Sequence, residues 1–95
     1  MIPVHPGRIL KRELKARELS ANRLALALRL PSGRITDILN EKRGISPDTA
    51  LRLARYFGNS ARFWLNLQTA YELAIAERDT GSIIEEEVKP LTDAA

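Results

Sequence analysis

The sequence predicts a single all-α domain of five helices with a short carboxy-terminal tail. The chain has 95 residues and no cysteine, which fits one small domain with a hydrophobic core and excludes a disulfide scaffold. Apolar residues recur at helical spacing between regular Pro, Gly and Ser punctuation. We expect residues 1–78 to form the folded domain, including a dimerisation helix, and residues 79–95 to form an acidic tail.

The first helix is expected over residues 6–18. Pro6 suits the first helical position, where a missing N–H costs nothing, and Leu10 and Leu14 fall on one side. The other side carries positive charges at i, i+3, i+4 and i+7, which are Arg8, Lys11, Arg12 and Lys15. A solvated face is the simplest interpretation of this basic stripe.

Two short helices are expected next. Ser20 is a suitable cap for a helix through Leu28, and Pro31 with Ser32 as its cap begins another that runs to Asn40. Helical spacing predicts that their inward-facing residues are Leu24, Ala25, Leu28, Ile35, Ile38 and Leu39.

Ser46 and Pro47 begin a fourth helix, which Gly58 ends. Its buried face is expected to comprise Ala50, Leu51, Leu53, Ala54 and Phe57. The fifth helix, over residues 61–78, starts after a cap at Ser60 and is apolar on two adjacent rows, so it has two surfaces to cover. One is its own core, and a second copy of the chain covers the other in a two-fold dimer. The predicted dimer contacts are Phe63, Trp64, Leu67, Tyr71 and Ile75.

The tail leaves alternatives open. Residues 82–88 could fold back as a short strand against the fifth helix, whereas the three consecutive glutamates at 85–87 equally fit a solvated or partner-ordered tail. Charge is unevenly divided: residues 1–58 hold twelve Lys or Arg and five acids, or +7, and residues 59–95 hold three and seven, or −4. A basic front half favours a polyanionic partner, and an acidic back half suits a basic protein or solvent.

The second and third helices are separated by only Arg29 and Leu30, with the small Ala25 where the helices would cross. This is a helix-turn-helix pattern. The outward side of the third helix carries short or hydrogen-bonding residues that suit base edges and phosphates. The candidate DNA-binding residues there are Ser32, Gly33, Arg34, Thr36, Asp37 and Asn40. Lys42 and Arg43 follow in the loop, Arg23 lies on the second helix, and Ser46 with the start of the fourth helix offers a hydroxyl and N–H groups to phosphate.

Three motifs give the chain a resemblance to the HigA-family antitoxins of the Xre-type, lambda-repressor-like helix-turn-helix superfamily. They are His5-Pro6-Gly7-Arg8-Ile9-Leu10, the segment from Arg43 to Ala54, and Phe63-Trp64-Leu65-Asn66-Leu67-Gln68. The resemblance implies a homodimer that binds a palindromic operator in its own promoter and neutralises a co-encoded, RNA-cleaving, HigB-like toxin. By position it also implies that the third helix reads the major groove and that Lys42 and Arg43 contact the DNA backbone.

The chain departs from this family at three positions. Ala21 stands where relatives usually have a DNA-contacting glutamine, and Asn22 or Arg23 is the candidate substitute. Arg29 and Glu41 stand where relatives have glycines. An arginine held at positive φ costs about 1 kcal/mol relative to glycine, so the turn is either strained or built differently. An acid at position 41 would weaken the attraction of phosphate beside Lys42.

Other classes of function lack support in the sequence. His5 is the only histidine and is expected to cap the first helix rather than bind metal, and no nucleophile–base pair or paired core carboxylates predict an enzyme. We expect no cofactor, no membrane association and a cytoplasmic location. Two alternatives remain, namely a stand-alone Xre-type regulator without a toxin and a helical protein-interaction module that never binds DNA.

Overall fold

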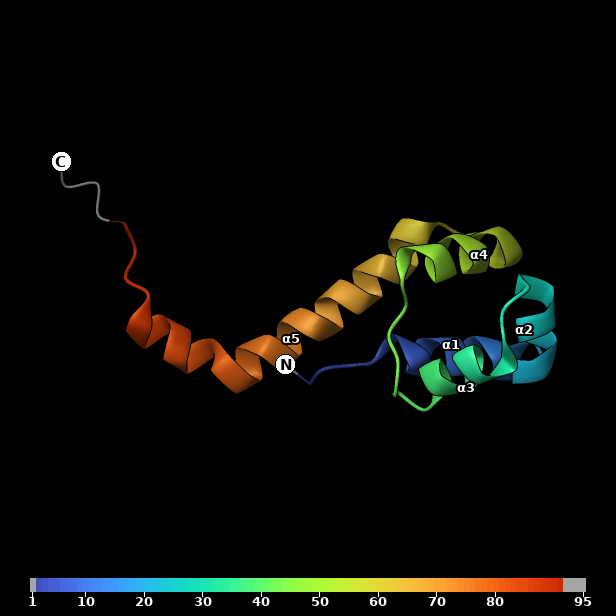
Figure 1. The fold of residues 1–95 in the computed structure, drawn as a ribbon, viewed down its shortest axis with the longest axis horizontal. Coiled ribbons are helices and arrows are strands. Elements are labelled where there is room, and N and C mark those ends of the chain that lie inside the picture. The colour runs from blue at the N-terminus through green and yellow to red at the C-terminus, as the bar shows by residue number, and fades with distance from the viewer. Residues whose placement is uncertain (1, 92–95) are drawn as a thin grey trace.

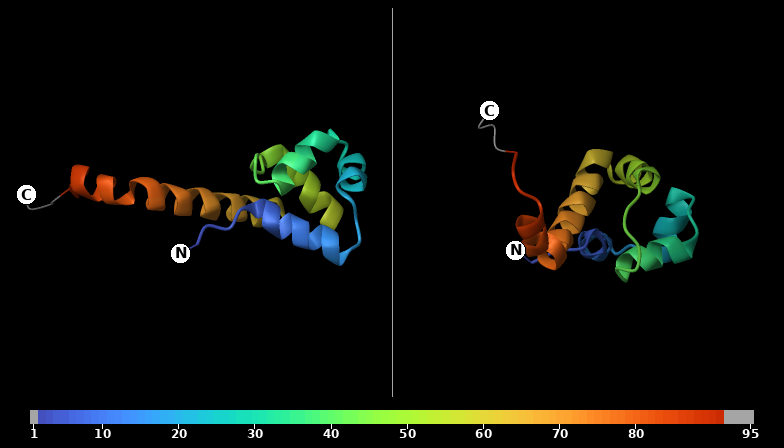
Figure 2. Two further views of the ribbon diagram at one scale, coloured as in Figure 1. Left: turned by 90° about the horizontal axis from the view of Figure 1, so that it is seen from below. Right: turned by 60° about the vertical axis from the view of Figure 1, so that its left-hand side comes forward.

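The structure is a computed structural model that describes residues 2–91. Four helices, α1 (Pro6–Ala16), α2 (Ala21–Leu28), α3 (Ser32–Leu39) and α4 (Pro47–Phe57), form a compact bundle, and the long α5 (Ala61–Glu87) begins on this bundle and projects from it. Figure 1 shows the projection, and the left view of Figure 2 shows it again from below. The molecule is therefore elongated, with extents of 58 × 23 × 22 Å. The prediction of an all-α, five-helix fold is confirmed.

Local capping fixes where most of the helices begin. The hydroxyl oxygens of Ser20, Ser46 and Ser60 accept hydrogen bonds from backbone N–H groups three residues on, at 3.0–3.3 Å. These three predicted caps are confirmed. Ser32 is different, because Pro31 is the N-cap residue of α3 and offers no side-chain acceptor, so Ser32 lies inside the helix. The prediction of Ser32 as a cap was wrong, because Pro31 already has the extended backbone of an N-cap residue and α3 begins directly after it.

Three helices end on a residue other than glycine in the left-handed region. Glu18, Arg29 and Glu41 have φ values of 52°, 60° and 62°. After each, the backbone N–H groups return to the preceding helix in the 6→1 and 5→2 pattern of a Schellman motif, for example from Leu30 to Ala25 at 2.9 Å. The turn between α2 and α3 is therefore a Schellman turn with an arginine at its left-handed position.

The core is a single cluster to which all five helices contribute. Its buried members are Leu10, Leu14, Leu24, Ala25, Leu28, Ile35, Ile38, Ile45, Ala50, Leu53 and Trp64. The inward-facing residues predicted for α2 and α3 lie in or against it. One prediction for α4 was wrong, because Leu51 is 64% exposed. It lies on the side of α4 that lines an open pocket with Ala27 and Leu28 of α2, where solvent reaches it.

The start of α1 packs closely against α3. The Nδ1 atom of His5 accepts a hydrogen bond from the N–H of Gly7 at 2.9 Å, which confirms the capping role predicted for this histidine. A Cβ atom on Gly7 would clash with the backbone carbonyl of Ile38. Glycine is therefore required where α1 crosses the end of α3.

The fifth helix is longer than the sequence predicts. It continues through Thr80 and Gly81 to Glu87, so the expectations of a helix end at 78 and of a strand over 82–88 were wrong. The pair Thr80-Gly81 does not stop the helix, because the threonine hydroxyl donates to the Ala76 carbonyl at 2.9 Å and glycine only lowers helix propensity. Pro90 sets the end, since proline disfavours helical backbone at the preceding residue. Residues 92–95 of the predicted tail lie outside the described residues.

Candidate nucleic-acid interface

The pair α2 and α3 forms a rigid platform. Leu24 and Ile35 are fully buried, and Ala25 is 2% exposed where the two helices cross. A larger residue than alanine would separate them, so the predicted reason for the small residue holds. The outer side of α3 is consequently presented to solvent in a fixed orientation.

The six α3-side candidates all lie at the surface. Ser32, Gly33, Thr36 and Asn40 are exposed, and Arg34 and Asp37 are half-buried. No atom lies within 4 Å of where a Cβ on Gly33 would stand. Packing within the protein therefore gives no reason for glycine there, and the backbone at the start of α3 is open to close approach. With Pro31 as an uncapped N-cap, the first N–H groups of α3 have no side-chain acceptor either.

The cationic candidates flank this surface. Arg23, Lys42 and Arg43 are exposed. Within residues 2–91, no ion pair of the structure uses these three side chains or that of Arg34. Their charges are therefore available to a polyanion.

Glu41, beside these cations, is itself paired. The Nε atom of Arg8 donates to its carboxylate at 3.1 Å. The ion pair joins α1 to the end of α3 and offsets part of the negative charge that Glu41 adds next to Lys42. Both side chains are more than a third exposed, so the pair contributes at most about 1 kcal/mol to stability.

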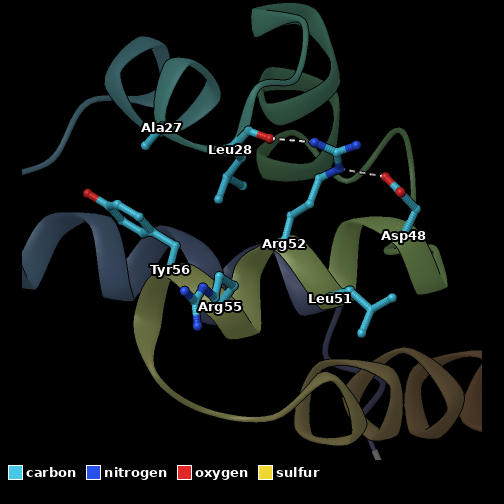
Figure 3. A pocket seen from close by; sticks show the side chains of 7 residues that line it. All are labelled: Ala27, Leu28, Asp48, Leu51, Arg52, Arg55 and Tyr56. Carbon is cyan, nitrogen blue, oxygen red and sulfur yellow. Dashed lines mark hydrogen bonds and ion pairs between the residues drawn. The ribbon is translucent and has the colours of Figure 1, made fainter.

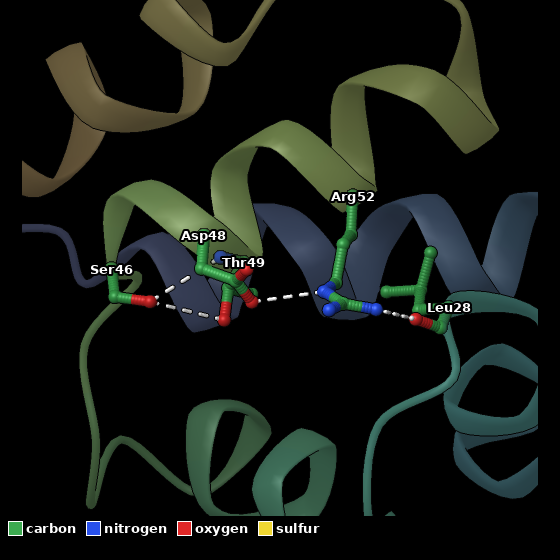
Figure 4. Close-up of polar contacts among 5 residues, drawn as sticks. All are labelled: Leu28, Ser46, Asp48, Thr49 and Arg52. Carbon is green, nitrogen blue, oxygen red and sulfur yellow. Dashed lines mark hydrogen bonds and ion pairs between the residues drawn. The ribbon is translucent and has the colours of Figure 1, made fainter.

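The hydroxyl of Ser46 is occupied within the protein. It accepts from the N–H of Thr49 at 3.3 Å and makes a second hydrogen bond to the Thr49 hydroxyl at 3.2 Å (Figure 4). What remains for a phosphate at the start of α4 is the N–H of Asp48, because Pro47 has no N–H and those of Thr49 and Ala50 donate to Ser46.

A contact that the sequence analysis missed fixes α2 against α4. The guanidinium of Arg52 donates to the carbonyl of Leu28 at 2.8 Å and to the carboxylate of Asp48 at 2.9 Å, as Figure 4 shows. Figure 3 shows both bonds from another side, together with the shallow pocket between the helices that Tyr56 also lines. The i, i+4 spacing of Asp48 and Arg52 was readable in the sequence, but the bond to Leu28 spans 24 residues and was not.

The predicted dimer residues separate into two groups. Trp64 is fully buried in the core of its own protomer, where its Nε1 donates to Oδ1 of Asn59 at 2.9 Å. It cannot line a dimer contact, so this assignment was wrong. Phe63 is 42% exposed, and Leu67, Tyr71 and Ile75 are half-buried. The projecting part of α5 adds exposed apolar residues that were not predicted, namely Leu73, Ile83 and Ile84.

His5 and Tyr71 join α1 to α5. Their rings meet edge to face with centroids 4.8 Å apart, and the imidazole is buried. This burial lowers the pKa of His5 below its ordinary value of 6.5; the carboxylate of Glu41 opposes the shift and Arg8 adds to it. A neutral imidazole is what the cap needs, because a protonated Nδ1 could not accept from Gly7.

Residues 2–91 provide neither a metal-binding cluster nor a membrane-spanning helix. No group of three or more His, Asp or Glu side chains among residues 2–91 is placed to hold a metal ion. No helix in that part of the structure combines the length and the apolarity that a membrane span requires.

Comparisons with known proteins agree with this geometry. A helix-turn-helix family model matches residues 10–64. The chain is 56% identical over 84 residues to virulence-associated protein I of Dichelobacter nodosus, covering 87% of this chain and 78% of that protein. It resembles the structure of an addiction module antidote protein of a HigA family from Coxiella burnetii (52% identity, TM-score 0.92, 95% and 99% of the two chains). It equally resembles the Pseudomonas aeruginosa antitoxin HigA solved with the higBA promoter (48% identity, TM-score 0.93, 96% and 100%).

Proposed function

The chain belongs to the Xre-type helix-turn-helix family and within it to the HigA antitoxins, and on this premise we propose that it is a dimeric repressor of its own promoter that also neutralises a co-encoded toxin. One observation carries the DNA-binding part. The exposed side of α3 lies beside three cationic side chains, Arg23, Lys42 and Arg43. None of the three forms an ion pair within residues 2–91.

The α3 residues divide by chemistry. Arg34 and Asn40 have side chains that form paired hydrogen bonds with guanine and adenine edges, and Thr36 offers a methyl group to thymine. Ser32, Gly33 and Asp37 complete the surface proposed to face the major groove. Lys42, Arg43 and Arg23 contact phosphates, as does the N–H of Asp48 at the start of α4.

Dimerisation supplies the symmetry of the operator. Phe63, Leu67, Tyr71 and Ile75, with the exposed Leu73, form the proposed contact on α5. Two protomers then present two α3 helices to half-sites about 34 Å apart, one turn of the duplex, and the operator is a palindrome.

The toxin is proposed to be a HigB-like, RNA-cleaving protein encoded beside this gene. A protein that binds RNA is basic, and residues 59–95 have a net charge of −4. The chain itself is proposed to be non-enzymatic and to act in the cytoplasm, where the promoter and the ribosome are accessible.

The test of DNA binding is a selection of the purified protein against a random duplex library at near-physiological salt, with non-specific competitor. Enrichment of a palindrome with half-sites one turn apart supports the proposal, and no enrichment contradicts it. On the selected duplex, Arg43→Ala should reduce the slope of log affinity against log salt by about one unit. Thr36→Ala and Asn40→Ala should instead relax the base preference, because they remove contacts to base edges.

The test of the antitoxin part is co-expression with the adjacent reading frame. Growth arrest by that product alone, its relief by this chain and co-purification of the two proteins would support it. A promoter-specific binder whose neighbouring frame is harmless would instead be a stand-alone regulator. A chain that selects no duplex and yet captures an acidic protein would be an interaction module.

A further inference from the structure

A side chain of α5, that of Gln68, forms a hydrogen bond with the backbone of the loop between α3 and α4. The N–H groups of residues 40–42 donate to carbonyls of α3 at 2.8–3.0 Å. No backbone–backbone hydrogen bond within residues 2–91 involves residues 43–45. The N–H of Ile45 donates instead to Oε1 of Gln68 at 2.8 Å. The backbone of the loop segment that directly follows Arg43 is therefore hydrogen-bonded to α5, and the buried side chain of Ile45 anchors the same segment in the core.

Gly44 is shaped to receive this side chain. A Cβ atom at position 44 would lie 2.6–2.7 Å from the three amide atoms of Gln68. Because φ of Gly44 is not in the left-handed region, the backbone itself would accept alanine. The glycine is required only to leave room for the glutamine amide.

Glu72 fixes which way the amide points. The Nε2 atom of Gln68 donates to the Glu72 carboxylate at 3.0 Å, one turn further along α5. A carboxylate only accepts, so it holds the NH₂ group and leaves Oε1 facing the loop. The three residues form a chain of hydrogen bonds from the surface of α5 to the loop that carries the phosphate-contacting cations.

We propose that Gln68 is a positioning residue for DNA binding, which sets the place of Arg43 at the phosphate backbone and couples it to α5. This inference rests on the proposed function for its DNA readout. It makes the dimerisation helix and the backbone-contacting loop parts of one unit. An event that moves Glu72 or the turn around it on α5 would displace Arg43 without touching α3.

Two substitutions break the attachment from opposite sides. Gln68→Leu removes the acceptor, and Gly44→Ala displaces it by filling its space. Thr69→Ala is the matched control, because Thr69 is an exposed neighbour on the same helix and no hydrogen bond of the described structure uses its side chain. Amide hydrogen exchange by NMR first tests the attachment alone. Exchange at Ile45 should accelerate in both variants and stay unchanged in the control.

DNA binding to a fixed, mixed-sequence duplex of 30 base pairs then tests the consequence. Both variants should lose about one unit of salt slope, which corresponds to an affinity about eightfold lower at 0.1 M salt. A merely destabilised but folded protein would keep its salt slope. In the double variant Gln68→Leu with Arg43→Ala, the two losses should not add, because both remove the same phosphate contact.

A swap keeps the test valid if the single variants fold poorly. Gln68→Glu with Glu72→Gln reverses the donor and acceptor along α5 but retains an oxygen facing Ile45, so it should restore binding that Gln68→Glu alone loses. Unchanged exchange at Ile45, wild-type salt slopes or additive losses with Arg43→Ala would each overturn the inference. If the wild-type protein binds no duplex, the proposed function and the coupling to DNA both fail, while the exchange result still decides whether Gln68 holds the loop.

Discussion

Arg29 shows how a single residue carries strain in the helix pair. It lies in the left-handed region at φ 60°, and its N–H returns to Leu26 within a Schellman motif. A side chain at this φ costs about 1 kcal/mol more than glycine. The geometry of the turn is therefore dictated by the close crossing of α2 and α3, and the sequence tolerates the cost.

Arg29→Gly should stabilise the protein by about 1 kcal/mol, because it relieves this strain. The free energy of unfolding in urea measures it. Gly58→Ala is the matched control, since Gly58 ends α4 at φ 78° and the substitution should destabilise by a similar amount. A destabilising Arg29→Gly would mean that the arginine side chain makes a compensating interaction.

His5 should make stability depend on pH. Its folded pKa is lowered by burial, so between pH 6.5 and that lower value the unfolded state binds more protons than the folded state. The stability it contributes is fully present above pH 6.5 and is lost as pH falls through the folded pKa. Urea unfolding at pH 7.5 and pH 5 should show a smaller difference for His5→Asn, which retains a capping side chain. Equal differences in the two proteins would contradict this.

At the scale of elements, α5 differs from the other four helices. Its first half packs on the bundle, whereas its second half projects and has no core of its own (Figure 2). Isolated helices shorter than about 15 residues are marginal in water. The projecting half of α5 therefore depends on packing for most of its stability. The exposed Leu73, Ile83 and Ile84 provide the apolar surface that such packing uses.

Gly81→Ala should strengthen the projecting half of α5 by up to about 1 kcal/mol. A Cβ at this position would meet only Cβ of Glu77, at an ordinary contact distance of 3.9 Å. Hydrogen exchange of the amides at 82–87 should slow by about fivefold, which is the factor that 1 kcal/mol gives. The amides of α2 provide the internal control. Unchanged exchange at 82–87 would mean that the glycine does not limit the helix.

At the scale of the whole molecule, the boundary between the basic and acidic halves of the chain coincides with the boundary between the bundle and α5. The bundle holds the basic half, and α5 holds most of the acidic half. An arrangement in which α5 pairs with a second copy keeps both basic surfaces facing outward toward one duplex.

Leu73→Glu should convert the proposed dimer into a monomer, because it places a charge on the proposed α5 contact. Leu51→Glu is the matched control: both leucines are more than half exposed, at 57% and 64%, but Leu51 lies on α4. Sedimentation equilibrium measures the molecular mass of each variant. A dimeric Leu73→Glu protein, or a monomeric Leu51→Glu protein, would place the contact elsewhere.

The sequence predicted which side chains of the candidate DNA-binding interface face solvent, because this follows from their positions within one helix. Helical spacing was sufficient to place Ser32, Thr36 and Asn40 outside and Ile35 and Ile38 inside. It was not sufficient for Phe63 and Trp64, which are adjacent on α5 and equally apolar. Only the packing of α5 on the bundle buries the tryptophan and exposes the phenylalanine.

The sequence by itself determined the first four helices, the start of α5, the caps at Ser20, Ser46 and Ser60, and the outward side of α3, because each depends on interactions within one or two turns. The tertiary structure alone decided the bond from Gln68 to Ile45 and the bond from Arg52 to Leu28. These pairs lie 23 and 24 residues apart. Which distant donors and acceptors meet is fixed by how the helices pack, and no local pattern in the sequence records it.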